Sequence, residues 1–311
     1  MVTDMKVFQG NRARIWRQFE QFLPMLSKIS GYNEDEISRL ILSAIRTEED
    51  DIITKKKMDR KPTYFLDIPK IENWLEKKVV PNTVLINTDD PDLLKLLVFS
   101  LAMPYKISKG EIKSTDRIAN KYFNRVFSDT FIGKIGEIAF KKYAEQKLGV
   151  EIEPDWAIGR DISTFQSDIT GSVKTVSIKS TDTLESIWAE APQPADYGIF
   201  IKVALPKDFF MKILAHVSSL RKLLRFVEEH LEKDDSVNDL LKFVEETAYG
   251  KEMTIKAYVC GFFEASPATL KHKGEELSYL GEVHEDKHLL ECNKLKYSPK
   301  DWEDLFSIIL L

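Results

Sequence analysis

Apolar positions recur at helical spacing through the first 110 residues, and polar segments separate these stretches. The first helix, near 15–26, is interrupted by Pro24 and is indicated by the apolar positions Ile15, Phe19, Phe22, Leu23 and Leu26. Asn33 and Glu36 have the spacing of a capping box that opens a second helix. We expect further helices near 69–79 and 91–102. The charged segment 47–63 has little periodicity, which predicts a surface loop or linker.

The pattern changes after about residue 110. One long helix or two abutting helices are expected over 115–147. Strand-like segments follow at GVEIEPD (149–155), SDI (167–169) and SVKTVSIKS (172–180). The segment DYGIFIKVAL (196–205) is nearly all apolar, as in a strand buried on both faces. TIKAYVCGFFEA (254–265) predicts another strand, and helices are expected at 207–230, 235–247 and 299–311.

This order of elements predicts an α/β fold, with a mixed β-sheet core flanked by helices and a mostly helical N-terminal region. The chain of 311 residues is long enough for two average domains or one elaborated domain. We expect a helical region over 1–110, used for recognition or dimerisation. The α/β domain is expected over 111–311, with a C-terminal extension.

Composition narrows the class of protein. The chain is 43% hydrophobic and 31% charged, which is typical of a globular protein and excludes a disordered or low-complexity chain. Forty-five basic against fifty acidic residues leave a net charge of −5, so a nucleic-acid surface has to be a local patch. Two cysteines form no disulfide framework, and neither a signal-peptide pattern nor an apolar run of about 18 residues is present. We therefore expect a cytoplasmic protein without a membrane partner.

Asp168 and Lys179 carry the first candidate chemistry. Asp168 precedes the turn Thr170-Gly171, and Lys179 ends the strand that follows, on the same strand face as Ser177. A hairpin at that turn brings the carboxylate beside the ammonium group. This combination suits metal-assisted hydrolysis, in which the carboxylate holds Mg²⁺ and the lysine orients or activates the attacking water. The alternative is a surface ion pair on a hairpin.

Glu137 is the second candidate acid. It lies close to the apolar face of its helix, where a carboxylate needs a partner because burying it alone is costly. Gly133 and Gly136 remove side chains before it and let another backbone approach. The alternative is a helix that packs through its glycines and leaves Glu137 in solvent.

The motifs GKIGEIAF, SDI, VSIKST and ADYGIFIKV, in this order over roughly residues 130–205, resemble the PD-(D/E)XK nuclease core. The whole order is closest to type II restriction endonucleases. The resemblance implies that Asp168 binds metal, that Lys179 is catalytic and that Glu137 is the glutamate of the first core helix. It also implies Mg²⁺ as cofactor and double-stranded DNA as substrate.

Ser177 departs from the family pattern, which has Asp or Glu two residues before the lysine. Some restriction enzymes have Ser-x-Lys and take the missing acid from a following helix. Glu185 and Glu190 lie downstream, and the capping-box spacing Asp182–Glu185 gives Glu185 a structural role. Glu137 and Glu190 are therefore the favoured second acids. The alternative is an inactive site.

Basic residues supply the candidate DNA surface. Four of them are spaced by four residues and form a stripe on a continuous helix: Lys113, Arg117, Lys121 and Arg125. The alternative is a solvated helix face. A second basic cluster, at residues 55–61, falls in the expected loop. His284, His288 and Cys292 have a spacing that would gather zinc ligands on a helix, but their segment is not convincingly helical and a fourth ligand is missing.

These observations predict a Mg²⁺-dependent type II restriction endonuclease that cuts double-stranded DNA at a short specific site. A DNA repair or junction-resolving nuclease and an inactive DNA-binding protein with a nuclease-like fold are the alternatives. Cutting both strands at a two-fold symmetric site favours a homodimer. The alternative is a monomer that nicks each strand in turn.

Overall fold

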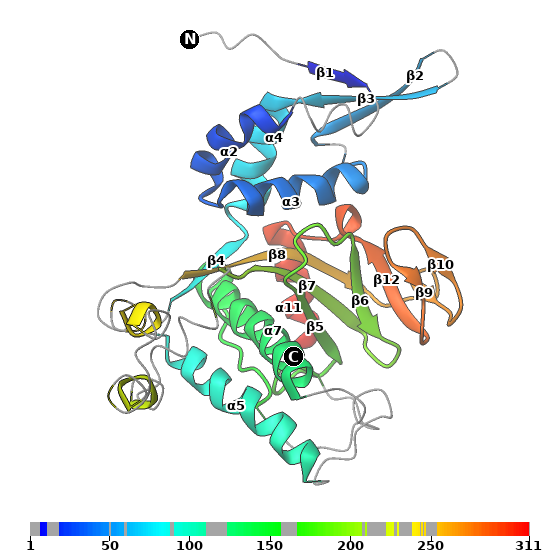
Figure 1. The fold of residues 1–311 in the computed structure, drawn as a ribbon. Helices are drawn as coiled ribbons and strands as arrows, with labels where there is room; N and C mark the ends of the chain where they lie inside the picture. The colour runs from blue at the N-terminus through cyan, green and yellow to red at the C-terminus, as the bar shows by residue number, and fades with distance from the viewer. Residues whose placement is uncertain are drawn as a thin grey trace.

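A four-stranded mixed sheet forms the centre of the protein (Figure 1). The computed structural model describes residues 7–10, 19–49, 51–58, 61–87, 90–109, 123–156, 167–206, 209, 222–226, 229, 238–242, 244, 246 and 254–310. The strand order is β4 (Thr83–Asn87), β8 (Thr254–Glu264), β7 (Tyr197–Ala204) and β5 (Val176–Thr181). β5 and β7 are parallel, whereas the other neighbours are antiparallel. The expected α/β class with a mixed sheet is confirmed.

Helices cover both faces of this sheet. On one face lie α5 (Pro91–Ser108), α7 (Phe123–Tyr143), the π-helical turn η3 (Ala144–Leu148) and α11 (Pro299–Ile309). Ile199, Ile201 and Val203 of β7 pack into this layer, and Phe200 and Ala204 point to the opposite one. Because both faces of β7 are covered, the strand is apolar at nearly every position.

The N-terminal helices form the second layer, on the upper side of the sheet in Figure 1. They are η1 (Glu20–Phe22), α2 (Leu23–Ser30), α3 (Glu34–Arg46), α4 (Ile68–Trp74) and the π-helical turn η2 (Leu75–Val79). The capping box of Asn33 and Glu36 is present at the start of α3. Pro24 stands in the first turn of α2 rather than interrupting a helix, since proline fits that turn without a missing hydrogen bond.

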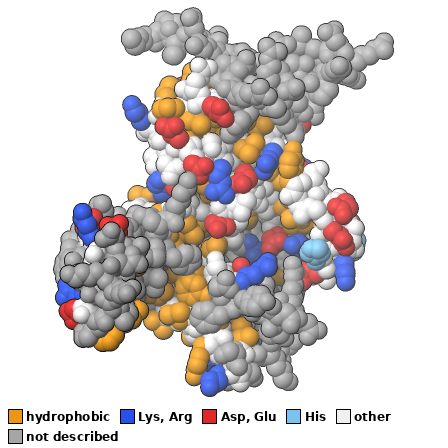
Figure 2. Space-filling model, viewed as in Figure 1, with side chains coloured by type: hydrophobic (Ala, Val, Ile, Leu, Met, Phe, Trp, Pro, Cys, Tyr) orange, Lys and Arg blue, Asp and Glu red, His pale blue; other side chains and the backbone are white. Residues whose placement is uncertain are grey.

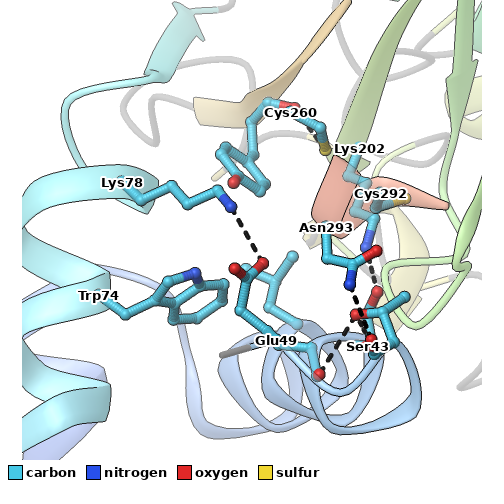
Figure 3. A pocket seen from close by; sticks show the side chains of 12 residues that line it. Ser43, Glu49, Trp74, Lys78, Lys202, Cys260, Cys292 and Asn293 are labelled. Carbon is cyan, nitrogen blue, oxygen red and sulfur yellow. Dashed lines mark hydrogen bonds and ion pairs between the residues drawn. The ribbon is translucent and has the colours of Figure 1, made fainter. Parts of the chain in front are cut away.

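A small pocket lies between these N-terminal helices and the sheet, and several polar residues line it (Figure 3). The buried ammonium of Lys78 pairs with Glu49 at 3.0 Å, and Lys202 of β7 donates to the hydroxyl of Ser43 on α3 at 2.7 Å. Asn293 donates to the carbonyl of Thr47 at 2.8 Å. The buried Lys202–Ser43 hydrogen bond ties α3 to β7, because breaking a buried polar pair leaves an unpaired group.

Three smaller sheets complete the described strands. β1 (Val7–Gly10), β3 (Lys61–Asp67) and β2 (Ile53–Met58) form an antiparallel sheet in the N-terminal region. β6 (Trp188–Pro192), β12 (Lys287–Glu291) and β9 (Leu270–Lys271) form another, followed by the short helix η4 (Cys292–Lys294). β10 (Glu276–Leu277) pairs with β11 (Gly281–Glu282).

Several expected elements differ in the structure. The loop expected over 47–63 is largely the β2–β3 hairpin, because antiparallel pairing satisfies the backbone of a charged segment as well as water does. The strand expected at 149–155 is a single bridge between Pro154 and Ile169, and the strand expected from Ser172 begins only at Val176. The region 1–110 holds strands as well as helices, and its strand β4 belongs to the central sheet.

The remaining helices agree with the sequence where they are described. α5 and α7 fall in the expected segments 91–102 and 115–147, and α11 begins at Pro299 after the cap Ser298. In 207–230 and 235–247 the described residues are helical. None of the helices within the described ranges is long and apolar enough to cross a bilayer.

Candidate active site at the edge of the central sheet

Asp168 lies along the outer edge of β5. β5 ends the sheet, so alternate backbone N–H and C=O groups of this strand point away from β7. The segment around Asp168 uses them: Asp168 N donates to the carbonyl of Val176 at 2.8 Å, and Ile178 N donates to the Asp168 carboxylate at 2.7 Å. The turn at Gly171, with φ of 79°, reverses the chain between them. The carboxylate is thereby fixed beside Ile178, the residue before Lys179 on β5.

Glu137 reaches this edge from α7. The helix comes close to β5 because Gly136 has no side chain: a Cβ there would lie 2.5 Å from Cβ of Ser180. The Ser180 hydroxyl donates to the carbonyl of Ile132 on α7 at 2.6 Å. Glu137 follows Gly136 and is buried. The glycine therefore has the expected role at position 136, whereas Gly133 has no such neighbour.

Lys134 is the buried partner of Glu137. Its ammonium lies 2.6 Å from the Glu137 carboxylate and donates to the Asp155 carbonyl at 2.5 Å. The same group lies 4.9 Å from the ring centre of Phe99 and 5.5 Å from that of Trp156. The carboxylate, the carbonyl and the two aromatic faces together offset the free-energy cost of burying the Lys134 ammonium.

Burial raises the pKa values of both acids. Burial raises the pKa of Glu137 to about 8, against the opposing effect of Lys134, and the nearby Asp168 raises it further. Burial also raises the pKa of Asp168, while the Lys179 ammonium and the Ile178 N–H oppose the shift. Asp168 thus acts on the pKa of Glu137, and Lys179 acts on the pKa of Asp168. Carboxylates with raised pKa values at one place are typical of functional sites.

Ser177 and Lys179 leave β5 on the face opposite α7. Val176 and Ile178 pack into the layer of α7, and the alternation of the strand places Ser177 and Lys179 on the other side. Ser177 is fully buried, and its hydroxyl has no hydrogen-bond partner among the described residues. Lys179 is partly exposed. Position 177 is therefore in the interior, where an Asp or Glu carboxylate would need a cation or hydrogen-bond donor beside it and the neutral serine does not.

Glu190 and Glu185 lie in other surroundings. Glu190 stands on β6, opposite Leu289 of β12, and pairs with Lys287 at 2.5 Å. Glu185 accepts from Arg39 of α3 at 2.6 Å. Partial burial raises the pKa of Glu185, but a backbone hydrogen bond and Arg39 outweigh it and lower the pKa. The capping box expected at Asp182 is absent because 182–187 is a turn rather than a helix. Of the two favoured second acids, Glu137 is the one that lies near Asp168, whose charge raises the pKa of Glu137.

The remaining predicted residues are placed as follows. Arg125 is exposed on α7, while Lys113, Arg117 and Lys121 lie outside the described residues. His288 is a buried residue of β12 with a 3.0 Å hydrogen bond to Thr269, and His284 lies in an exposed segment. Within the described ranges there is no cluster of three or more His, Cys, Asp or Glu suited to a metal ion.

Sequence reasoning missed Lys134 and Asp155. The signal for Lys134 was its spacing of three residues before Glu137, which places both on one helix face. Asp155 contributes a backbone carbonyl to Lys134, and its charge raises the pKa values of both Glu137 and Asp168. Its position depends on the bridge between Pro154 and Ile169, which no local pattern indicates.

Comparisons with known proteins add no relative: no protein-family model, no curated protein and no solved structure matches this chain. The geometry of the edge site therefore carries the functional argument.

Proposed function

We propose that this protein is a Mg²⁺-dependent type II restriction endonuclease of the PD-(D/E)XK superfamily, which hydrolyses phosphodiester bonds at a short site in double-stranded DNA. The observation that carries the proposal is the position of Asp168 at the edge of β5, where it interacts electrostatically with Glu137 of α7 and with Lys179 of β5. These residues come from separate segments, and the parallel pair β5–β7 follows the motif order of the resemblance. A chance surface ion pair requires neither the buried glutamate nor the close approach of α7.

The donor set fits Mg²⁺. This ion prefers oxygen ligands and keeps several water molecules, so one or two carboxylates together with substrate phosphates hold it. Asp168 and Glu137 supply two carboxylates whose pKa values are raised by burial, and Asp168 raises that of Glu137 further; a divalent cation would offset both effects. Two protein acids therefore suffice without a third at Ser177.

The residues have distinct roles in the proposed reaction. Asp168 and Glu137 would hold the ion, and the hydrogen bond from Ile178 N fixes the orientation of the Asp168 carboxylate. When bound, Mg²⁺ neutralises phosphate charge at the scissile bond. Lys179 orients the attacking water beside the phosphate. Lys134, one turn earlier on α7, holds the Glu137 carboxylate in place through their buried ion pair.

The DNA itself is expected along the α7 side of the edge. Arg125 is exposed on the same helix as Glu137, three turns before it, so a phosphate backbone at the site can reach its guanidinium group. The predicted homodimer supplies two such sites for the two strands of a symmetric duplex.

Plasmid cleavage with and without Mg²⁺ tests the proposal. We expect wild-type protein to produce discrete fragments only with Mg²⁺, and Asp168→Asn and Lys179→Ala to lose at least about 100-fold in rate, since each removes a group at the reacting phosphate. DNA binding by both variants should persist. Asp182→Asn, an exposed acid just beyond β5, is the matched control with unchanged cleavage.

Two results would contradict the proposal. Full cleavage by Asp168→Asn would show that Asp168 is not a metal ligand of the active site. Site-specific binding without any cleavage by wild-type protein would instead favour the inactive DNA-binding protein, for which Ser177 is the supporting observation.

A further inference from the structure

The Lys134 ammonium is buried beside the candidate active site, in a part of the protein that is apolar on its outside. α5 packs along α7, and Figure 2 shows hydrophobic side chains at the lower left of the molecule, where these two helices lie in Figure 1. Lys134 itself is 8% exposed. Burying an ammonium group is costly unless groups of the protein compensate it. The partners of Lys134 therefore determine where its charge lies.

Each of the two proposed metal ligands uses one carboxylate oxygen within the protein. Oε2 of Glu137 accepts from the Lys134 ammonium at 2.6 Å, and Oδ2 of Asp168 accepts from Ile178 N at 2.7 Å. Within the described ranges, the second oxygen of either acid has no hydrogen-bond donor. Since a carboxylate can bind a metal ion through a single oxygen, Oε1 of Glu137 and Oδ1 of Asp168 are left for the ion.

The segment of Asp155 and Trp156 fixes the Lys134 ammonium at Oε2. The Asp155 carbonyl accepts from this ammonium at 2.5 Å, and the ring centre of the next residue, Trp156, lies 5.5 Å from it. Phe99 of α5 supports the arrangement, because its ring meets that of Trp156 edge to face, with 5.7 Å between the ring centres. A change at Trp156 can therefore reach Glu137 by moving the ammonium of Lys134.

Trp156 acts through the faces of its ring rather than through its N–H group. Its indole nitrogen is buried and has no hydrogen-bond partner in the part of the chain that the structure describes. A second ammonium, that of Lys95, lies 4.2 Å from the ring centre. Phenylalanine offers an aromatic face to a cation without the N–H group, whereas leucine offers none. Substitution by each residue thus separates the aromatic face from the lost volume.

We propose that Trp156 is a positioning residue of the metal site. Its ring keeps the Lys134 ammonium on Oε2 of Glu137 and thereby leaves Oε1 for a divalent cation. The inference rests on the proposed function, because it takes Glu137 as a metal ligand. Residues that orient metal ligands from behind typically change metal affinity by about 10–100-fold when they are removed.

Isothermal titration of the full chain with Mg²⁺, without DNA, tests the inference. Trp156→Leu should raise the Mg²⁺ dissociation constant by about 10-fold or more. Trp156→Phe should stay within about three-fold of wild type, because it keeps an aromatic face. Trp188→Leu is the matched control: Trp188 is equally half-buried but lies on β6 and donates to the Ser278 carbonyl at 2.8 Å. Its dissociation constant should be unchanged.

Melting curves without metal separate positioning from a merely structural role. A structural role would lower the melting temperature of Trp156→Leu and leave its Mg²⁺ dissociation constant unchanged. If Trp156→Leu does not fold, Trp156→Met takes its place, since methionine adapts to irregular gaps and has no ring.

A double-mutant cycle tests whether Trp156 acts through Lys134. Adding Trp156→Leu to Lys134→Met should change the Mg²⁺ dissociation constant by less than about two-fold, since the ammonium that the ring holds is already gone. Wild-type affinity in Trp156→Leu, equal losses in the leucine and phenylalanine variants, or a full additional loss in the Lys134→Met background would each overturn the inference.

Cleavage by the same samples separates this inference from the proposed function. Wild-type protein that binds Mg²⁺ and cleaves DNA, with a Trp156→Leu variant of unchanged affinity, overturns the role of Trp156 and leaves the nuclease proposal standing. The expected pattern of Mg²⁺ affinities without any cleavage supports the role of Trp156 and contradicts the nuclease proposal. Wild-type protein that binds no Mg²⁺ contradicts both.

Discussion

At the scale of single residues, the Lys134–Glu137 pair decides the chemistry of the edge site. Both side chains are buried, and their charges lie 2.6 Å apart. Burial nevertheless raises the pKa of Glu137 to about 8, so the ammonium alone does not keep the carboxylate ionised at neutral pH. A divalent cation at Asp168 would supply the additional positive charge.

Substitution of the two favoured second acids separates their roles. Glu137→Gln should reduce Mg²⁺-dependent cleavage by at least about 100-fold, because it removes a metal ligand beside Asp168. Glu190→Gln is the matched control, since Glu190 pairs with Lys287 in the β6–β12 sheet, and its cleavage should stay within a few-fold of wild type. The opposite pattern in a plasmid assay would make Glu190 the second acid.

The raised pKa of Glu137 predicts how stability depends on pH without metal. The folded protein holds this proton more tightly than the unfolded chain does, so stability falls as pH rises from 4.5 to about 8. The contribution of one such group is at most about 1.4 kcal/mol per pH unit. Glu137→Gln has no proton to lose there, and its stability relative to wild type should rise over this range.

Denaturant unfolding of both proteins at several pH values measures this difference. Stabilisation of the wild type by Mg²⁺ should grow over the same range, since the ion binds the ionised carboxylate. A stability difference that is independent of pH would contradict the assignment of the raised pKa to Glu137.

At the scale of elements, the contact between α7 and β5 determines whether the site forms. Gly136→Ala should lower the free energy of unfolding by about 1–3 kcal/mol, because the new Cβ would overlap with Ser180. The helix would also move away from the sheet, so cleavage should fall as well. Thermal melting and a cleavage assay measure the two effects.

Gly133→Ala is the control for this contact. A Cβ at Gly133 meets no atom within 4 Å, so the substitution should stabilise the helix by about 0.5–1 kcal/mol. Equal effects of the two substitutions would show that helix propensity, rather than the approach of Ser180, governs position 136.

At the scale of the whole molecule, the N-terminal region and the sheet form one packed unit. β4 pairs with β8, α5 packs on α7, and α3 is tied to β7 through Ser43 and Lys202. A chain starting at residue 111 lacks β4 and both helices, which uncovers β8 and the face of β7. We expect it to be insoluble or to show no cooperative melting.

A chain that starts at residue 19 provides the comparison. It loses β1 but keeps the central sheet and the helices on both of its faces, so it should melt cooperatively. Cooperative melting of the chain that starts at residue 111 would instead support the predicted boundary at 110 as a true domain boundary.

The sequence by itself determined the elements that rest on local physics. Apolar periodicity predicted α3, α5 and α11, and the capping box of Asn33 and Glu36 marked the start of α3. The uniformly apolar segment predicted β7 as a strand covered on both faces. These features are local because capping, helix periodicity and full burial of a strand each leave a mark within a few residues.

Only the tertiary structure decided which polar residues meet. Glu190 and Glu137 were equally acceptable acids in the sequence, yet Glu190 pairs with Lys287 because antiparallel β6 and β12 place them together. The Lys134 ammonium pairs with Glu137 and also lies against the rings of Phe99 and Trp156, which come from distant segments. Pairing across a sheet and packing between layers depend on contacts far apart in sequence, which no local spacing records.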